Sequence, residues 1–123
     1  MDANVLNALH TDRVVDITTT GRKSGQPRRI EIALIYVDEE TYVLSGAPGP
    51  RSWHANLLAN PELTVHVKKS AQADLKARAT EVTDEAARRD LIARMSEWDI
   101  KRADIDQAAW VKAAPLMKVQ VVG

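Results

Sequence analysis

The sequence contains no cysteine, and this absence excludes several kinds of site at once. A disulfide framework, a thiolate metal site and a thiol nucleophile all need cysteine. The three histidines, His10, His54 and His66, share no spacing typical of metal ligands, so we expect no metal site. The sequence also lacks an apolar run of about 18 residues and a basic-then-apolar amino terminus. These absences predict a cytoplasmic protein without a membrane span.

Net charge is also absent. Lys and Arg together number 17, as do Asp and Glu, so the formal net charge is zero. Aromatic residues are few, with three Trp, two Tyr and no Phe. A broad phosphate track and a stacking platform, on which nucleic-acid binding depends, are therefore both missing. We expect no nucleic-acid partner, and any effect of charge must be local.

The residues that are present predict a strand-rich domain. The length of 123 residues and the 45% of apolar residues predict one domain, 1–123, with a packed core. Alternating or β-branched runs predict strands at 13–20, 28–37, 41–46, 62–69, 74–83 and 115–122. Helices are expected at 2–10, 52–60 (with Ser52 as its N-cap), 83–98 and 104–114. Hairpins outnumber strand–helix–strand crossovers, which favours a mainly β (α+β) fold, an antiparallel barrel with peripheral helices.

The first unusual stretch is GRKSGQPR at 21–28, between two predicted strands. Its glycines let backbone N–H groups face an anion, and Arg22, Lys23 and Ser24 add donors. Arg28 begins the next strand, from which its side chain can reach back toward the turn. The arrangement suits a phosphorylated or polycarboxylated ligand, although it matches neither GxxxxGK[ST] nor GxGxxG. A solvated basic loop without a ligand is the alternative.

The second unusual stretch is SGAPGPRSWHANLL at 45–58. Gly46 and Gly49 permit close approach of a flat ligand, and Trp53 and His54 open a helix whose free N–H groups favour an anion. The alternatives are that Trp53 anchors the helix in the core and that His54 is an ordinary surface residue. No grouping of acid, base and nucleophile occurs elsewhere, so in an enzyme a cofactor must carry the chemistry.

Together, TTTGRKSGQPRR at 18–29 and WHANLLANPELTV at 53–65 resemble the deazaflavin-dependent nitroreductase family, whose members use coenzyme F-420. The resemblance implies a split β-barrel related to FMN-binding reductases. It also implies that the basic turn grips the phosphate and polyglutamate tail of the deazaflavin, while the loop after the hairpin approaches the ring. Carried over by motif, the implied cofactor contacts are Arg22, Lys23, Ser24, Gly25, Arg28, Ser45, Gly46, Ala47, Trp53, His54, Asn56 and Leu57.

The activity that the resemblance implies is hydride transfer from reduced F-420 to an electron-poor acceptor, such as an activated alkene, a quinone or a nitro compound. No catalytic side chain is implied, and solvent is expected to protonate the product because no tyrosine follows Tyr42. The alternatives are an FMN-dependent oxidoreductase and a non-catalytic protein that binds a cofactor or hydrophobic ligand. Four cations, at 22, 23, 28 and 29, favour the longer acidic tail of F-420. Apolar runs at 14–17 and 116–122 suggest a face covered by a second subunit, hence a possible homodimer.

Overall fold

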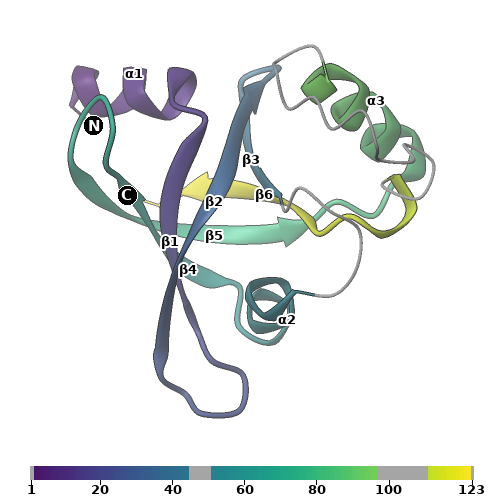
Figure 1. Ribbon diagram of the computed structural model, residues 1–123, viewed down its shortest axis with the longest axis horizontal. Helices are drawn as coiled ribbons and strands as arrows, with labels where there is room; N and C mark the ends of the chain where they lie inside the picture. Colours follow the sequence, from purple (N-terminus) through teal and green to yellow (C-terminus); the bar gives the residue numbers. More distant parts are fainter. Residues whose placement is uncertain (1, 45–50, 97–110, 123) are drawn as a thin grey trace.

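The protein is a closed barrel of six strands with helices around it (Figure 1). The computed structural model describes residues 2–44, 51–96 and 111–122. All neighbouring strands are antiparallel, in the order β1-β2-β3-β6-β5-β4, which confirms the predicted fold class. The strands are β1 (Val14–Thr20), β2 (Pro27–Val37), β3 (Glu40–Leu44), β4 (Glu62–Val67), β5 (Ala73–Glu81) and β6 (Leu116–Val121). The helices are α1 (Ala3–Thr11), α2 (Ser52–Ala59) and α3 (Glu85–Ser96). Most of the helix expected at 104–114 lies outside the described residues.

The barrel interior follows from the two-residue period of its strands, which sends alternate side chains to opposite faces. On β1, buried and half-buried residues alternate along the whole strand. The helices α1 and α2 bury apolar side chains in the same core from different sides of the barrel (Figure 1). Most apolar residues of the runs at 14–17 and 116–122 are buried in the cores of this one chain, whereas Val122 is 60% exposed. The homodimer stays a prediction. The most buried members of this core are Ala8, Val15, Ile17, Leu34, Val43, Leu57, Val65 and Met117.

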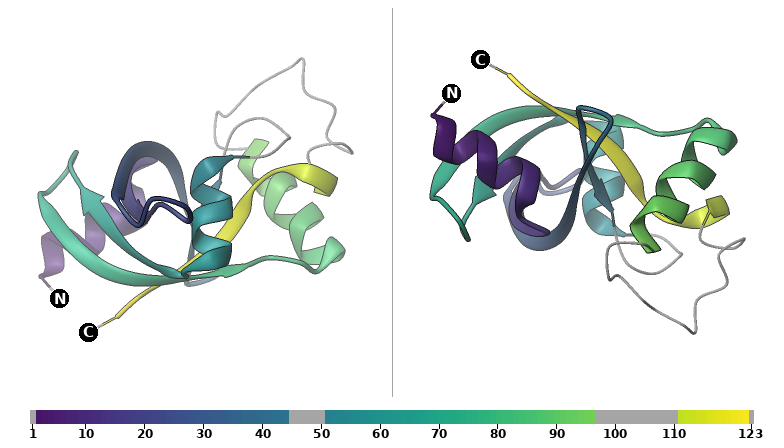
Figure 2. Two further views of the ribbon diagram at one scale, coloured as in Figure 1. Left: turned by 90° about the horizontal axis from the view of Figure 1, so that it is seen from below. Right: turned by 90° about the horizontal axis from the view of Figure 1, so that it is seen from above.

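A second apolar core lies outside the barrel, beneath α3. Alternation along β2 places Ala33 and Ile35 on the same face as Arg29 and Glu31, a pattern that predicts a face toward solvent or a site. Ile35 is instead buried, because Leu91 and Ile92 of α3 cover this face together with Leu44 and Leu116 from the neighbouring strands. Figure 2 shows α3 on the side of the barrel opposite α1. The continuous apolar run at 33–37 is typical of a strand covered on both faces, but it does not identify α3 as the element that covers the second face.

Arg88 of α3 fastens this second core to the chain that enters β6. Its side chain is buried, and its guanidinium donates hydrogen bonds to three main-chain carbonyl oxygens. Nε lies 2.7 Å from the oxygen of Val111, Nη1 lies 2.8 Å from that of Val82, and Nη2 reaches Ala114. Burial lowers the pKa of Arg88 from its usual value. One side chain therefore satisfies three carbonyls that would otherwise be buried without a donor.

The β1–β2 hairpin separates from the barrel near its tip, where it projects beyond the other strands beside α2 (Figure 1). The ladder between β1 and β4 ends at the pair Thr18 and Thr64. β1 continues to Thr20 and β4 begins at Glu62, but these end residues do not pair with each other. Residues 16–18 of β1 pair with both β2 and β4, whereas Thr19 and Thr20 pair with β2 alone. Beyond Thr18 the hairpin therefore extends past the barrel without a ladder to β4.

No helix within the described ranges is both long and apolar enough to cross a bilayer.

We predict that Arg88→Ala lowers the free energy of unfolding by about 2–4 kcal/mol, because three carbonyls lose their donor and a cavity remains. Urea unfolding followed by tryptophan fluorescence measures the change. Arg89→Ala is the matched control, since this neighbouring side chain is 66% exposed and its ion pair in the described part of the chain is with Glu85, one turn along the helix. Its effect should stay within about 0.5 kcal/mol. Equal effects of the two substitutions would contradict the role given to Arg88.

Candidate functional site

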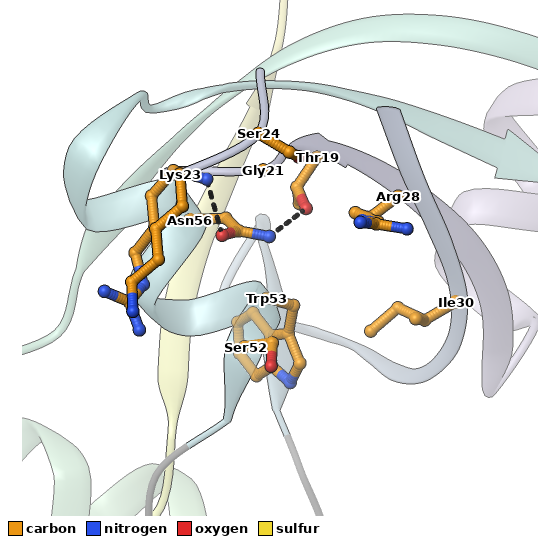
Figure 3. A pocket seen from close by; sticks show the side chains of 10 residues that line it. Thr19, Gly21, Lys23, Ser24, Arg28, Ile30, Ser52, Trp53 and Asn56 are labelled. Atoms are coloured by element: carbon orange, nitrogen blue, oxygen red, sulfur yellow. Dashed lines mark hydrogen bonds between the residues drawn. The ribbon is translucent and has the colours of Figure 1, made fainter. Parts of the chain in front are cut away.

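A cavity of about 450 Å³ lies between the inner face of the β1–β2 hairpin and α2 (Figure 3). Its volume is in the range of about 300–1,000 Å³ that small-molecule sites occupy. The hairpin supplies most of the wall, and the first two turns of α2 supply the rest. The lining residues are Thr19, Gly21, Arg22, Lys23, Ser24, Arg28, Ile30, Ser52, Trp53 and Asn56.

The turn at the tip of the hairpin is a compact, internally bonded loop. The amide of Gly21 donates to the oxygen of Gln26, and the amide of Gly25 donates to the oxygen of Gly21, both at 2.8 Å. Gly25 has a φ of 70°, a conformation that residues with a Cβ rarely adopt. A Cβ on Gly21 would lie 2.6 Å from Oγ of Ser24, so glycine lets this side chain fold over the turn. That Oγ accepts a hydrogen bond from the amide of Gln26 at 3.2 Å.

Asn56 joins this turn to α2. Its side-chain Oδ1 accepts a hydrogen bond from the backbone amide of Arg22 at 3.0 Å, and its Nδ2 donates to Oγ1 of Thr19 at 3.1 Å (Figure 3). Asn56 and Thr19 are both buried, at 5% and 2% exposure. Both ends of the amide are thus engaged within the protein. Asn56 therefore fixes the distance between the basic turn and the helix that faces it.

Three cations border the cavity, and no Asp or Glu is among the lining residues that the structure describes. Arg22, Lys23 and Arg28 are exposed, and none of them forms an ion pair within the described ranges. Three positive charges close together repel one another unless an anion or solvent screens them. The cavity therefore has the charge and the donors to hold an anionic ligand.

Arg29, the fourth cation of the sequence, lies on the other face of the hairpin. Its Nε is 3.0 Å from Oδ2 of Asp16, whose Oδ1 lies 2.8 Å from Nζ of Lys68. The hydrogen bond from Lys68, together with that from Arg29, lowers the pKa of Asp16 against a smaller opposing effect of burial. Arg29 therefore does not border the cavity, because successive residues of a strand point to opposite faces. Three of the four cations expected to favour a long acidic tail remain at the cavity: Arg22, Lys23 and Arg28.

The amino terminus of α2 also faces this region. The expected N-cap, Ser52, is the first residue of the helix, and Arg51 occupies the cap position with no capping hydrogen bond from its side chain. Ser52 and Trp53 both line the cavity. Trp53 is only 5% exposed and belongs to the barrel core, so it is both an anchor of the helix and part of the cavity wall. Free N–H groups at a helix start favour an anion.

The remaining expected contacts lie elsewhere. Nε2 of His54 is 3.0 Å from Oε1 of Glu81 on β5, and Leu57 is 1% exposed within the core. Gly25 lines a second cavity on the outer face of the hairpin. The positions of Ser45, Gly46 and Ala47 lie outside the described residues. Four lining residues were not expected: Thr19, Gly21, Ile30 and Ser52. Strand alternation could have identified Thr19 and Ile30, because both lie on the same face of the hairpin as Arg28.

A hydrogen-bonded chain of Thr18, His66 and Asp74 lies on the outer surface of the barrel. Nε2 of His66 is 2.6 Å from Oγ1 of Thr18, and its Nδ1 is 2.6 Å from Oδ1 of Asp74. The bond to His66 lowers the pKa of Asp74. Although the order of groups resembles a hydrolase triad, the three residues sit on β1, β4 and β5 in regular strand positions, without the exposed turn that presents a nucleophile. They link three strands.

Solved structures with the same fold are known. The structure of a heme storage protein from Vibrio cholerae has a TM-score of 0.73 at 16% identity, over 97% of this chain and 88% of that chain. That of an FAD-binding protein from Mesorhizobium loti has a TM-score of 0.68 at 19% identity, over 100% and 91%. A reductase dependent on F-420-H2 has a TM-score of 0.54 at 21% identity, over 89% and 95%. Identities this low establish the fold alone.

Membership of a family rests on a different comparison. The family model of the F-420H(2)-dependent quinone reductases matches residues 1–106. The match includes both sequence motifs, the basic turn and the whole of α2. The chain therefore belongs to the F-420H(2)-dependent quinone reductase family and is a reductase that depends on coenzyme F-420.

Proposed function

We propose that the cavity between the hairpin and α2 holds the phosphate and the acidic tail of F-420. The observation that carries this proposal is a set of three cations, Arg22, Lys23 and Arg28, around one cavity, with neither an ion-pair partner nor a lining carboxylate among the described residues. A phosphate with a chain of carboxylates supplies the several negative charges that these side chains lack. The amino terminus of α2 borders the opposite wall through Ser52 and Trp53, and the positive end of the helix dipole favours an anion there.

The bound cofactor, when reduced, supplies a hydride to an electron-poor organic acceptor, for which we propose a quinone, an activated alkene or a nitro compound. The chain contributes position and charge. Ile30 and Trp53 give the cavity an apolar wall, while the turn holds the anionic end of the ligand. The described lining has no His, Tyr or carboxylate that could give a proton to the product, which supports solvent as the proton source.

We predict that Arg22→Ala/Lys23→Ala weakens the binding of F-420 by about 10- to 100-fold, because two charge-assisted contacts are lost. Titration followed by tryptophan quenching measures the dissociation constant, with FMN titrated in parallel. Lys69→Ala/Lys112→Ala removes the same charge from exposed positions away from the cavity and should leave affinity nearly unchanged. Equal losses of F-420 affinity in both double variants would mean that the change in net charge, and not the position of Arg22 and Lys23, causes the effect. Preferred binding of FMN would contradict the proposed ligand.

The class of acceptor is tested by turnover. We predict that the protein with reduced F-420 oxidises the cofactor when a benzoquinone is added, and that activated alkenes and nitroaromatics compete for the same site. The rise in the absorbance of the oxidised deazaflavin, as the reduced form is consumed, gives the rate. Arg22→Ala/Lys23→Ala should lower the rate at low cofactor concentration and recover at high concentration, because the two residues bind the tail and not the reacting ring. Tight binding of F-420 without turnover of any acceptor would instead support a cofactor-binding role.

We further propose that Asn56 positions the anion site without touching the ligand. Asn56→Ala should weaken F-420 binding about tenfold, since the turn loses its attachment to α2. Asn60→Ala is the matched control at the C-cap of α2, because Oδ1 of Asn60 accepts a local hydrogen bond from the amide of Glu62 and is not among the residues that line the cavity. If Asn56 acts through the turn, its effect should shrink when Arg22 and Lys23 are already alanine, which a double-mutant cycle measures. Fully additive losses would mean that Asn56 contacts the cofactor itself.

A further inference from the structure

The outer face of the same hairpin borders a second cavity, of about 550 Å³. It opens where β1 separates from β4, beyond the last paired residues Thr18 and Thr64. Gly25 and Pro27 form the hairpin side, and Leu63 of β4 is part of the floor. The turn that borders the first cavity through Gly21 thus also borders the second through Gly25.

Two cations of β5 line this second cavity. Lys76 and Arg78 lie two residues apart on one face of the strand, and both are exposed. In the described part of the chain, neither forms an ion pair. Farther along the same outer surface, Lys68 and Arg29 are neutralised by Asp16 and Glu31.

The second cavity also contains one carboxylate. Glu62 lies opposite Arg78 in the β4–β5 register, yet no ion pair joins them. Two cations against one anion leave an excess of positive charge beside the hairpin. The hydroxyls of Thr20 and Thr64 add groups that can donate to a carboxylate.

We propose that this second cavity is a subsite for the distal carboxylates of the polyglutamate tail, with Lys76 and Arg78 as its binding residues. The inference rests on the proposed function, in which the turn holds the phosphate and the first part of the tail. A tail that continues past the turn reaches its outer side at Gly25, where the second cavity begins. Longer tails then gain contacts that shorter tails cannot make.

The test uses F-420 preparations that differ only in the number of glutamates, one against several, with dissociation constants from tryptophan quenching. Wild-type protein should bind the longer tail more tightly. Lys76→Ala/Arg78→Ala should weaken binding of the longer tail by about two- to tenfold and leave the single-glutamate form within about twofold. Lys76→Glu/Arg78→Glu should enlarge the difference, because like charges repel the tail.

The control is Lys69→Ala/Lys112→Ala, which removes two exposed positive charges from outside both cavities. It should leave the preference for the longer tail intact. If wild-type protein binds F-420 without any preference for tail length, or if the Lys76 and Arg78 variants keep the preference, the subsite is wrong while the proposed function stands. If wild-type protein does not bind F-420 at all, the proposed function and the subsite fall together.

Discussion

The side-chain amide of Asn56 is the interaction on which the candidate site depends. Beyond Thr18, β1 leaves the barrel and pairs with β2 alone among the described strands. Without a further attachment, its position relative to α2 would be set by one ladder alone. Asn56 supplies that attachment through Arg22 and Thr19, and it is buried, so water competes little for either bond. This attachment holds the turn that carries Arg22 and Lys23 at a defined position relative to α2.

The second principle of the structure is the division of charge between the two faces of the hairpin. Strand alternation sends Arg28 to the inner face and Arg29 to the outer face. On the outer face Arg29 and Lys68 are neutralised by carboxylates, whereas on the inner face the cations have no such partner within the described residues. A protein with zero net charge thereby leaves positive charge unneutralised locally, at the cavity on the inner face of the hairpin. Local charge, rather than the total, determines which ligands this surface can attract.

Much of the fold could be predicted from local patterns, because alternation and capping act over a few residues. Asp2 accepts the amides of Asn4 and Val5 at the start of α1, as a helix start there requires. The second core and the three-carbonyl role of Arg88 could not be predicted, since both depend on segments far apart in the sequence. From the sequence alone, an arginine next to apolar residues of a helix is expected at the surface, and its burial follows only from the packing of distant segments.

The candidate site could likewise be predicted only where local motifs determine it. The residues of the turn and their neighbours on α2 were expected from the sequence motifs, and the structure gathers six of them around one cavity: Arg22, Lys23, Ser24, Arg28, Trp53 and Asn56. The pairing of His54 with Glu81 depends on how α2 docks against β5, and no local pattern contains that information.

A crystal structure of the protein with F-420 tests the central claim most directly. The account predicts density for the phosphate between the side chains of Arg22 and Lys23 and the start of α2, with both hydrogen bonds of Asn56 unchanged. Density for the phosphate on the outer face of the hairpin, or a rotated Asn56 that bonds the cofactor, would contradict it.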